Sequence, residues 1–343
     1  ARARRAGSQG DGAGLTVRPL RVAFFGSPAF ALPSLEALLR RHDVVMVVSQ
    51  PDKPSGRGMR VTAPPVAQRA RELGLELWQP TRLRRDEPFL ARLRELDLDV
   101  GVTAAYGRLL PTAVLAGPRH GVLNVHASLL PRHRGAAPIQ WALIEGDEET
   151  GVTIMQTEEG LDTGPIRLQR RTPVREDEDA AALSERLSRL GAEALTEALD
   201  LLAEGTLPST PQDDALATQA PLLTPEDGHV RWERPAAAVH ARHRGVSVWP
   251  GTSFAHGGER VKVTALGVAA TDDAQLARVA GDDRERWLAA APGEVLAVDA
   301  EGLTVRAGEG AVRLLRVKPP GGREMGARDW ANGRGVRQGA RLG

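Results

Sequence analysis

The sequence contains no cysteine among its 343 residues. Disulfide bonds, thiolate zinc sites and a cysteine nucleophile are therefore all excluded. The chain also lacks any apolar run approaching the ~18 residues needed to cross a bilayer, so we expect no membrane partner. It has little excess charge of either sign, because the formal net charge is only +1. Composition therefore gives no general case for nucleic-acid binding, which only a local basic surface could indicate.

Residues 1–20 lack both an initiator methionine and the apolar segment of a secretory signal. They are rich in arginine and glycine and have little to bury, which predicts a disordered leader. Because no targeting signal is recognisable, we expect a cytoplasmic protein.

The patterning of residues 21–205 predicts one Rossmann-like, doubly wound α/β domain with a mostly parallel sheet. Val22–Phe25 and Val44–Val48 are short apolar runs, and the leucines between them recur at helical spacing, which is typical of a βαβ unit. Further runs predict helices over residues 66–73, 87–96 and 180–202 and strands over residues 75–78, 100–105 and 151–156. The first turn, Gly26-Ser27-Pro28, is not G-x-G-x-x-G, so nothing here indicates a dinucleotide cofactor.

A second, smaller domain is predicted over residues 226–343, after a proline-rich linker at 206–225. Short strand-like runs predict an OB-like β-barrel, with one helix over 236–244 and an acidic loop insertion over 269–291. The runs are at 230–232, 253–254, 261–263, 293–297, 303–307 and 312–317. We expect three tryptophans, Trp232, Trp249 and Trp330, in the barrel core. From Arg306 onward the sequence contains nine cationic residues and only three carboxylates, and this excess of positive charge favours a polyanionic partner.

Three polar residues suggest a catalytic set. Asn124 and His126 are two residues apart in a predicted strand, so their side chains face the same way. Asp162 lies between glycines in Gly160-Leu161-Asp162-Thr163-Gly164. No G-x-S-x-G elbow surrounds Ser128, which argues against a serine hydrolase. An amide and an imidazole without a nucleophile suit direct attack of an amine on a carbonyl, with the carboxylate orienting the imidazole or collecting a proton.

Two basic segments remain open to alternative interpretations. Residues 50–60, Gln-Pro-Asp-Lys-Pro-Ser-Gly-Arg-Gly-Met-Arg, are expected to form a loop that is either merely solvated or orders on phosphates. In the turn after Pro131, we expect His133 at the surface. Arg132 and Arg134 could contact phosphate, although Arg134 could equally bind a neighbouring carboxylate.

Several motifs resemble those of the 10-formyltetrahydrofolate-dependent formyltransferases. They are N-V-H-A-S-L-L-P-R-x-R-G-A-A-P-I-Q from Asn124, G-V-T-I-M-Q from Gly151 and G-L-D-T-G from Gly160. Segments 24–30 and 105–111 also fit, and segment 50–58 resembles a loop that meets the acceptor stem in the members acting on tRNA. The resemblance extends from about Arg21 to the end of the chain, through a C-terminal β-barrel of the kind that holds tRNA.

The resemblance implies the role of each candidate residue. The catalytic residues would be Asn124, His126 and Asp162. The folate would contact Ser128, Leu129, Leu130 and Pro131, with Tyr106 and Gly107 nearby. The tRNA would contact Lys53, Arg57 and Arg60, and no metal would take part.

The resemblance is greatest to the members that formylate initiator methionyl-tRNA. We therefore expect 10-formyltetrahydrofolate as the formyl donor, tetrahydrofolate as its product and a monomeric enzyme. One alternative is a relative acting on a small amine, such as a nucleotide-linked amino sugar or glycinamide ribonucleotide. Another is an RNA- or folate-binding module without catalysis. The basic loop and the barrel weigh against the first alternative, and the intact trio weighs against the second.

Overall fold

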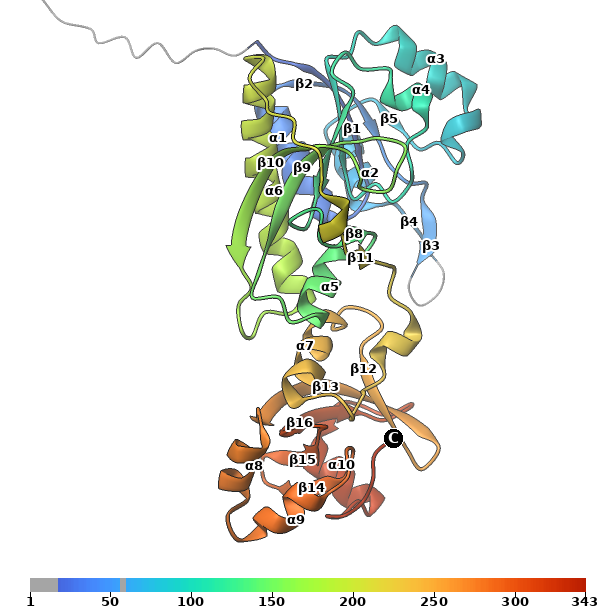
Figure 1. Cartoon of the computed structure of the whole chain (residues 1–343). Helices are drawn as coiled ribbons and strands as arrows, with labels where there is room; N and C mark the ends of the chain where they lie inside the picture. The colour runs from blue at the N-terminus through green and yellow to red at the C-terminus, as the bar shows by residue number, and fades with distance from the viewer. Residues whose placement is uncertain (1–17, 56–59) are drawn as a thin grey trace, which may run out of the picture.

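The computed structural model describes residues 18–55 and 60–343. It has two lobes joined end to end, a larger α/β domain and a smaller β-rich domain (Figure 1). The seven strands of the larger domain lie in the order β10-β9-β7-β6-β1-β2-β5. The strands from β5 to β7 run parallel, whereas β9 and β10 are antiparallel to their neighbours. They span β1 Arg21–Gly26, β2 Asp43–Val48, β5 Leu77–Trp78, β6 Val100–Ala104, β7 Val122–His126, β9 Glu149–Gln156 and β10 Ile166–Pro173.

Helices cover both faces of this sheet, so its central strands are continuous apolar runs rather than alternating ones. Along β1, Val22 and Phe24 pack against α1 and α6, whereas Ala23 and Phe25 pack against α3 and α4. The helices are α1 Leu32–Arg41, α2 Pro65–Glu72, α3 Glu87–Glu95, α4 Thr112–Leu115, α5 Pro138–Ile144 and α6 Ala180–Ala203. The predicted doubly wound sheet is therefore confirmed. The antiparallel edge strand β10, which the sequence analysis did not identify, extends it.

The smaller domain is an antiparallel sheet in the order β12-β13-β16-β15-β14, with β17 paired to β16, which confirms the predicted second β domain. The strands are β12 Thr252–His256, β13 Glu259–Ala270, β14 Val295–Asp299, β15 Gly302–Arg306, β16 Ala311–Lys318 and β17 Met325–Gly326. Helices α7 Ala236–Gly245 and α10 Ala327–Arg334 pack against its core, which includes Trp232 and Trp330. Trp249 was wrongly placed in this core, because 52% of its surface is exposed.

Two further predictions for this domain are wrong. Residues 230–232 are not a strand: His229 makes one isolated bridge to Ser253, and a turn follows. The segment 269–291 is helical rather than a loop, with α8 Asp273–Ala280 and α9 Arg284–Ala289. Leu276 and Trp287 from these helices are buried against the sheet. The acidic residues of this segment lie at the helix starts, where Asp272 caps α8 through the Gln275 N–H and Glu285 lies in the first turn of α9.

The segment between the two sheets contacts the larger domain along much of its length. It contains the 3-10 helix η3 Asp214–Leu216, strand β11 Gln219–Ala220 and the 3-10 helix η4 Pro225–Gly228. Strand β11 pairs in parallel with β8 Arg134–Gly135. Near the junction α5 and α7 pack closely, because Gly245 of α7 has no side chain to meet Ile144. Within the described residues, no helix combines the length and apolarity needed to span a bilayer.

Candidate active site

The three predicted catalytic residues come together where the end of β7 meets the loop after β9. Asn124 and His126 lie on β7, two residues apart, and Asp162 lies in the loop between β9 and β10. The Asp162 carboxylate faces both of them, with Oδ1 3.5 Å from Asn124 Nδ2 and Oδ2 3.7 Å from His126 Nδ1. His126 is buried and only 13% of the Asp162 side chain is exposed. The structure thus brings together an amide donor, an imidazole and a carboxylate.

The glycines around Asp162 allow its loop to approach the sheet. A Cβ atom at Gly164 would lie 1.9 Å from the Gln156 carbonyl oxygen, and one at Gly160 would lie 2.2 Å from Thr163 Oγ1. Asp162 itself adopts φ +54°, a left-handed conformation that few residues other than glycine, asparagine and aspartate tolerate. The two glycines and this backbone conformation together turn the carboxylate back toward β7.

The protonation pattern of His126 follows from one hydrogen bond. Its Nε2 lies 2.9 Å from the His133 carbonyl oxygen, which can only accept. Nε2 therefore carries a proton, and Nδ1 is the nitrogen left to interact with Asp162 and with a substrate. The neutral ring would present a lone pair at Nδ1, and the imidazolium would donate from it.

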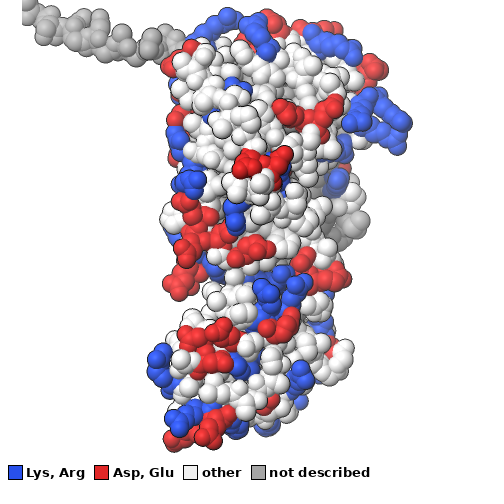
Figure 2. Space-filling model, viewed as in Figure 1, with Lys and Arg blue, Asp and Glu red and all other residues white. Residues whose placement is uncertain are grey.

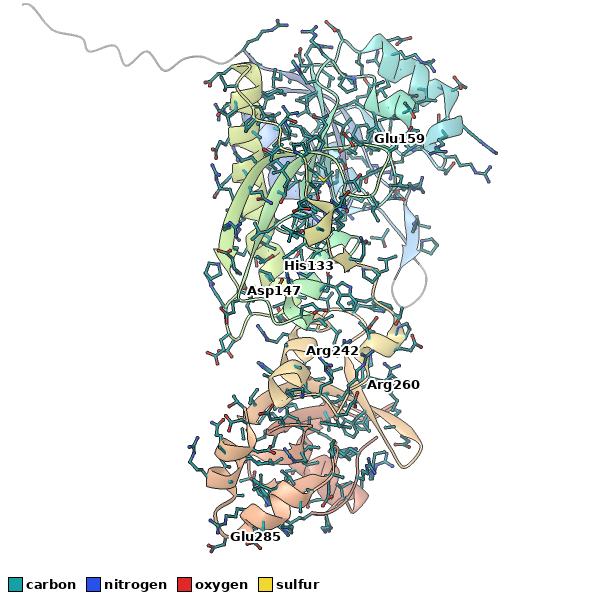
Figure 3. All side chains as sticks on the ribbon, in the orientation of Figure 1. His133, Asp147, Glu159, Arg242, Arg260 and Glu285 are labelled. Carbon is teal, nitrogen blue, oxygen red and sulfur yellow. The ribbon has the colours of Figure 1, made fainter. Side chains whose placement is uncertain are left out.

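The His133 side chain was wrongly predicted to lie at the surface. It is 3% exposed, and its Nε2 lies 2.6 Å from Asp147 Oδ2 (Figure 3). Asp147 also accepts a hydrogen bond from the half-exposed Arg132. His133 has φ +59°, so its side-chain contact with Asp147 holds a turn whose carbonyl orients His126. No local sequence pattern indicates this contact, because Asp147 lies fourteen residues further along.

The turn after His133 completes the support of the carboxylate. Gly135 donates its backbone N–H to Asp162 Oδ2 at 2.9 Å. Arg134 is 6% exposed and binds Gln212 and the Asp214 carboxylate. Of the two interpretations left open for Arg134, the structure supports the contact with a neighbouring carboxylate.

In the segment 128–131, which was predicted to contact the folate, the Ser128 hydroxyl and the Leu130 N–H form hydrogen bonds within the protein. Ser128 is fully buried and donates to the Arg132 carbonyl at 2.6 Å. Leu130 is 3% exposed and its backbone N–H binds Thr153 Oγ1. Leu129 and Pro131 are half-buried. The Ser128 hydroxyl and the Leu130 side chain therefore shape the segment from within, and Leu129 and Pro131 are the side chains left near the surface.

Tyr106 and Gly107 follow β6, the strand beside β7. Tyr106 is 2% exposed, its ring packs edge-on against Phe25, and burial raises the pKa of its hydroxyl to about 12. Its carbonyl accepts a hydrogen bond from Gln50 Nε2. Gly107 is exposed with φ +78°, and Leu109 beside it exposes 61% of its surface. Tyr106 thus acts as a core residue, and the residues after it form the exposed rim of the sheet.

The predicted basic loop at 50–60 contains a hairpin, with β3 Lys53–Ser55 antiparallel to β4 Arg60–Thr62. Its base is fixed through Asp52, which accepts hydrogen bonds from Gln79 and Arg71. Lys53 is exposed. Arg57, which was predicted to contact tRNA, lies outside the described residues.

The basic character predicted for the C-terminal segment is partly neutralised by ion pairs. Arg306 is buried and paired with Asp273, and Arg316 and Arg334 pair with Glu324 and Glu259. Acidic and basic side chains are interspersed over the displayed face of both domains (Figure 2). The exposed cations of this segment are the ion-paired Arg316 and Arg334 together with Lys318, Arg323, Arg328, Arg337 and Arg341.

Comparison with known proteins covers both domains. Residues 20–199 match the model of the formyl transferase family, and residues 222–335 match that of the formyl transferase C-terminal domain. A protein of Deinococcus radiodurans named methionyl-tRNA formyltransferase is 52% identical over 94% of this chain and 95% of its own length. Another of that name, from Thermus thermophilus, is 48% identical over 94% of this chain and 99% of its own.

Solved structures share the fold at low identity. An N-formyltransferase from Helicobacter canadensis, in complex with folinic acid and dTDP-3-aminofucose, has a TM-score of 0.63 and is 14% identical, covering 86% of this chain and 98% of that one. HypX from Aquifex aeolicus in complex with tetrahydrofolic acid has a TM-score of 0.57 at 20% identity, covering 91% of this chain and 47% of that one. These two structures support the architecture described above.

Proposed function

This chain belongs to the formyl transferase family, and we propose that it transfers a formyl group from 10-formyltetrahydrofolate to the α-amine of initiator methionyl-tRNA. The observation that carries this proposal is the similarity of the whole chain, both domains included, to methionyl-tRNA formyltransferases at 43–52% identity. The fold alone does not choose the acceptor, because the N-formyltransferase in complex with an amino sugar covers 86% of this chain. The sequence identity, which extends through both domains, is what favours methionyl-tRNA.

The proposed reaction begins with attack of the neutral amine on the formyl carbon of the donor. A carbon–nitrogen bond forms, and the carbonyl oxygen becomes an oxyanion. The two donors that would hydrogen-bond it are Asn124 Nδ2 and, when the His126 ring is the imidazolium, His126 Nδ1. Hydrogen bonds to developing charge in a partly buried site are worth more than in water, and both side chains are held by the sheet before substrate arrives.

Asp162 would manage the proton. The attacking nitrogen becomes positively charged and must lose one proton before the intermediate collapses. The Asp162 carboxylate lies 3.5 Å from Asn124 Nδ2 and 3.7 Å from His126 Nδ1, so it can accept that proton directly or through water. The oxyanion then re-forms the carbonyl as the bond from the formyl carbon to N10 of the folate breaks, and N10 takes up a proton. The products are the N-formylated methionyl-tRNA and tetrahydrofolate.

The substrates would approach the rim formed by the ends of β6 and β7. The folate would lie against Gly107 and the segment 128–131, where Leu129 and Pro131 are half-buried. The acceptor end of the tRNA would meet the β3–β4 hairpin through Lys53, Arg57 and Arg60, while the C-terminal domain holds the body of the tRNA. We also propose that residues 21–205 form the catalytic domain and that the enzyme acts as a monomer.

The test is formylation of purified methionyl-tRNA, compared with free small amines and repeated across salt concentrations. We expect activity only with methionyl-tRNA and a steep fall in kcat/KM with ionic strength, because phosphate contacts release counterions. Equal activity on a small amine, or a rate that is flat with salt, would overturn the assignment of the acceptor.

A further inference from the structure

The segment that joins the two domains makes direct contact with the catalytic loop. Gln212 lies in this segment and is half-buried. Its side-chain Nε2 donates two hydrogen bonds, to the Asp162 carbonyl at 2.9 Å and to the Gly164 carbonyl at 2.7 Å. Both protons of the amide are therefore used on the loop that carries the catalytic carboxylate.

The orientation of the Gln212 amide is fixed by Arg134. Its Oε1 accepts from Arg134 Nε at 3.0 Å and from Nη2 at 2.8 Å. Arg134 can only donate and the two backbone carbonyls can only accept, so the amide has one satisfied orientation. The guanidinium is itself held, since 7% of its side chain is exposed and it also binds Asp214 Oδ1.

The same segment supports Asp162 from a second side. Strand β11 pairs with β8 (Figure 1), and the Arg134 N–H donates to the Thr218 carbonyl at 2.9 Å. This pairing places Gly135, whose N–H binds Asp162 Oδ2. Gly135 is held so close to β11 that a Cβ atom would lie 2.6 Å from the Ala220 carbonyl oxygen.

The catalytic loop needs such support because Asp162 occupies the left-handed region. Aspartate tolerates that conformation better than most residues with a Cβ atom, but the conformation still has a free-energy cost that surrounding contacts offset. Gln212 binds the carbonyls of Asp162 and of the glycine two residues later, and thus holds the backbone on both sides of Thr163.

We propose that Gln212 is a positioning residue for formyl transfer, and that the inter-domain segment acts as a strap that holds the Asp162 carboxylate against Asn124 and His126. This proposal rests on the proposed function, because it assigns Asp162 the role of proton acceptor. In this role the inter-domain segment differs from the linker predicted at 206–225, which would only connect the two domains.

The test compares two substitutions with a matched control in the full-length chain. Gln212→Ala removes the clamp, and Gln212→Glu keeps the size and the contact with Arg134 but replaces the donating amide by a carboxylate that faces two carbonyls. Gln219→Ala removes an exposed side chain of the same segment and leaves the backbone pairing of β11 with β8 intact. We expect both Gln212 variants to lower kcat by about 10- to 100-fold, as small misplacements of catalytic groups do, with KM for both substrates and the kcat of Gln219→Ala unchanged.

A double-mutant cycle separates positioning from a general structural role. If Gln212 acts through Asp162, adding Gln212→Ala to Asp162→Asn should cost at most about twofold more in single-turnover rate, because the group being positioned is already lost. A further loss as large as that in the wild-type background, or a kcat of Gln212→Glu within twofold of wild type, would overturn the proposal.

Hydrogen exchange tests the strap independently of activity. In Gln212→Ala the amides of residues 161–164 should exchange at least about tenfold faster than in the wild-type chain and in Gln219→Ala, since the loop opens locally when its contacts are removed. Unchanged exchange would refute the strap whichever acceptor the enzyme uses. A wild-type chain that fails to formylate methionyl-tRNA while the exchange result holds would refute the proposed function alone.

Discussion

Replacing Asp162 by Asn separates the chemical role of the carboxylate from its structural role. The asparagine side chain keeps an oxygen that can accept the Gly135 N–H, which lies 2.9 Å from Oδ2 in the structure. What is lost is the difference between a charge-assisted and a neutral hydrogen bond, so the free energy of unfolding should fall by only about 1 kcal/mol.

Turnover should respond far more strongly than stability. An amide cannot accept the proton that the attacking amine must lose, and removal of a general base lowers rates by about 10²- to 10⁴-fold. This range corresponds to about 3–5.5 kcal/mol of lost transition-state stabilisation. The new amide nitrogen would also face either the Asn124 amide or the Gly135 N–H, both of which donate hydrogen bonds to Asp162. One of these two hydrogen bonds would therefore be lost.

The assay is single-turnover formylation of methionyl-tRNA with saturating donor, together with a thermal melt of the same samples. Asp97→Asn is the matched control, because 82% of that side chain is exposed and it pairs with Arg119 away from the trio. We expect the control to be fully active. A single-turnover rate of Asp162→Asn within tenfold of wild type, in a protein that melts normally, would refute the role of Asp162 as proton acceptor.

Three further predictions concern stability. Gly135→Ala should lower both the melting temperature and kcat, since its Cβ atom would collide with the Ala220 carbonyl at a φ of +127°. Leu276 is fully buried although it lies in a largely exposed helical insertion, so Leu276→Ala should lower the free energy of unfolding by about 2–5 kcal/mol in urea titrations; a cost below about 1 kcal/mol would contradict its place in a packed core. Burial alone would raise the pKa of Glu178, but its hydrogen bonds with Arg186 hold that pKa below the ordinary 4.5. The stability that this pair contributes is therefore complete above about pH 5 and is lost as the pH falls through the lowered pKa. Glu178→Gln should reduce this acid sensitivity in melts from pH 7 to pH 3. The same substitution should destabilise the protein at pH 7 by about 3 kcal/mol.

Hydrophobic periodicity was enough to locate most helices and strands. The long apolar runs, such as β1 and β6, are buried on both faces of the sheet. They can therefore be recognised as strands without knowing which residues pack against them. The burial of His133 and the exposure of Trp249 were predicted wrongly because the tertiary structure decides both. His133 is polar but is buried on Asp147, which lies fourteen residues further along. Trp249 is apolar but lies in a turn that the fold leaves exposed.

The fold class and the identity of the candidate trio could be predicted from the sequence, because Asn124, His126 and Asp162 each lie within a distinctive local motif. How the trio is held depends on tertiary contacts. The carbonyl of His133 assigns the proton of His126, and Gln212 reaches the loop of Asp162 from fifty residues away. These contacts join segments that are distant in sequence, so their formation depends on the sheet that brings those segments together.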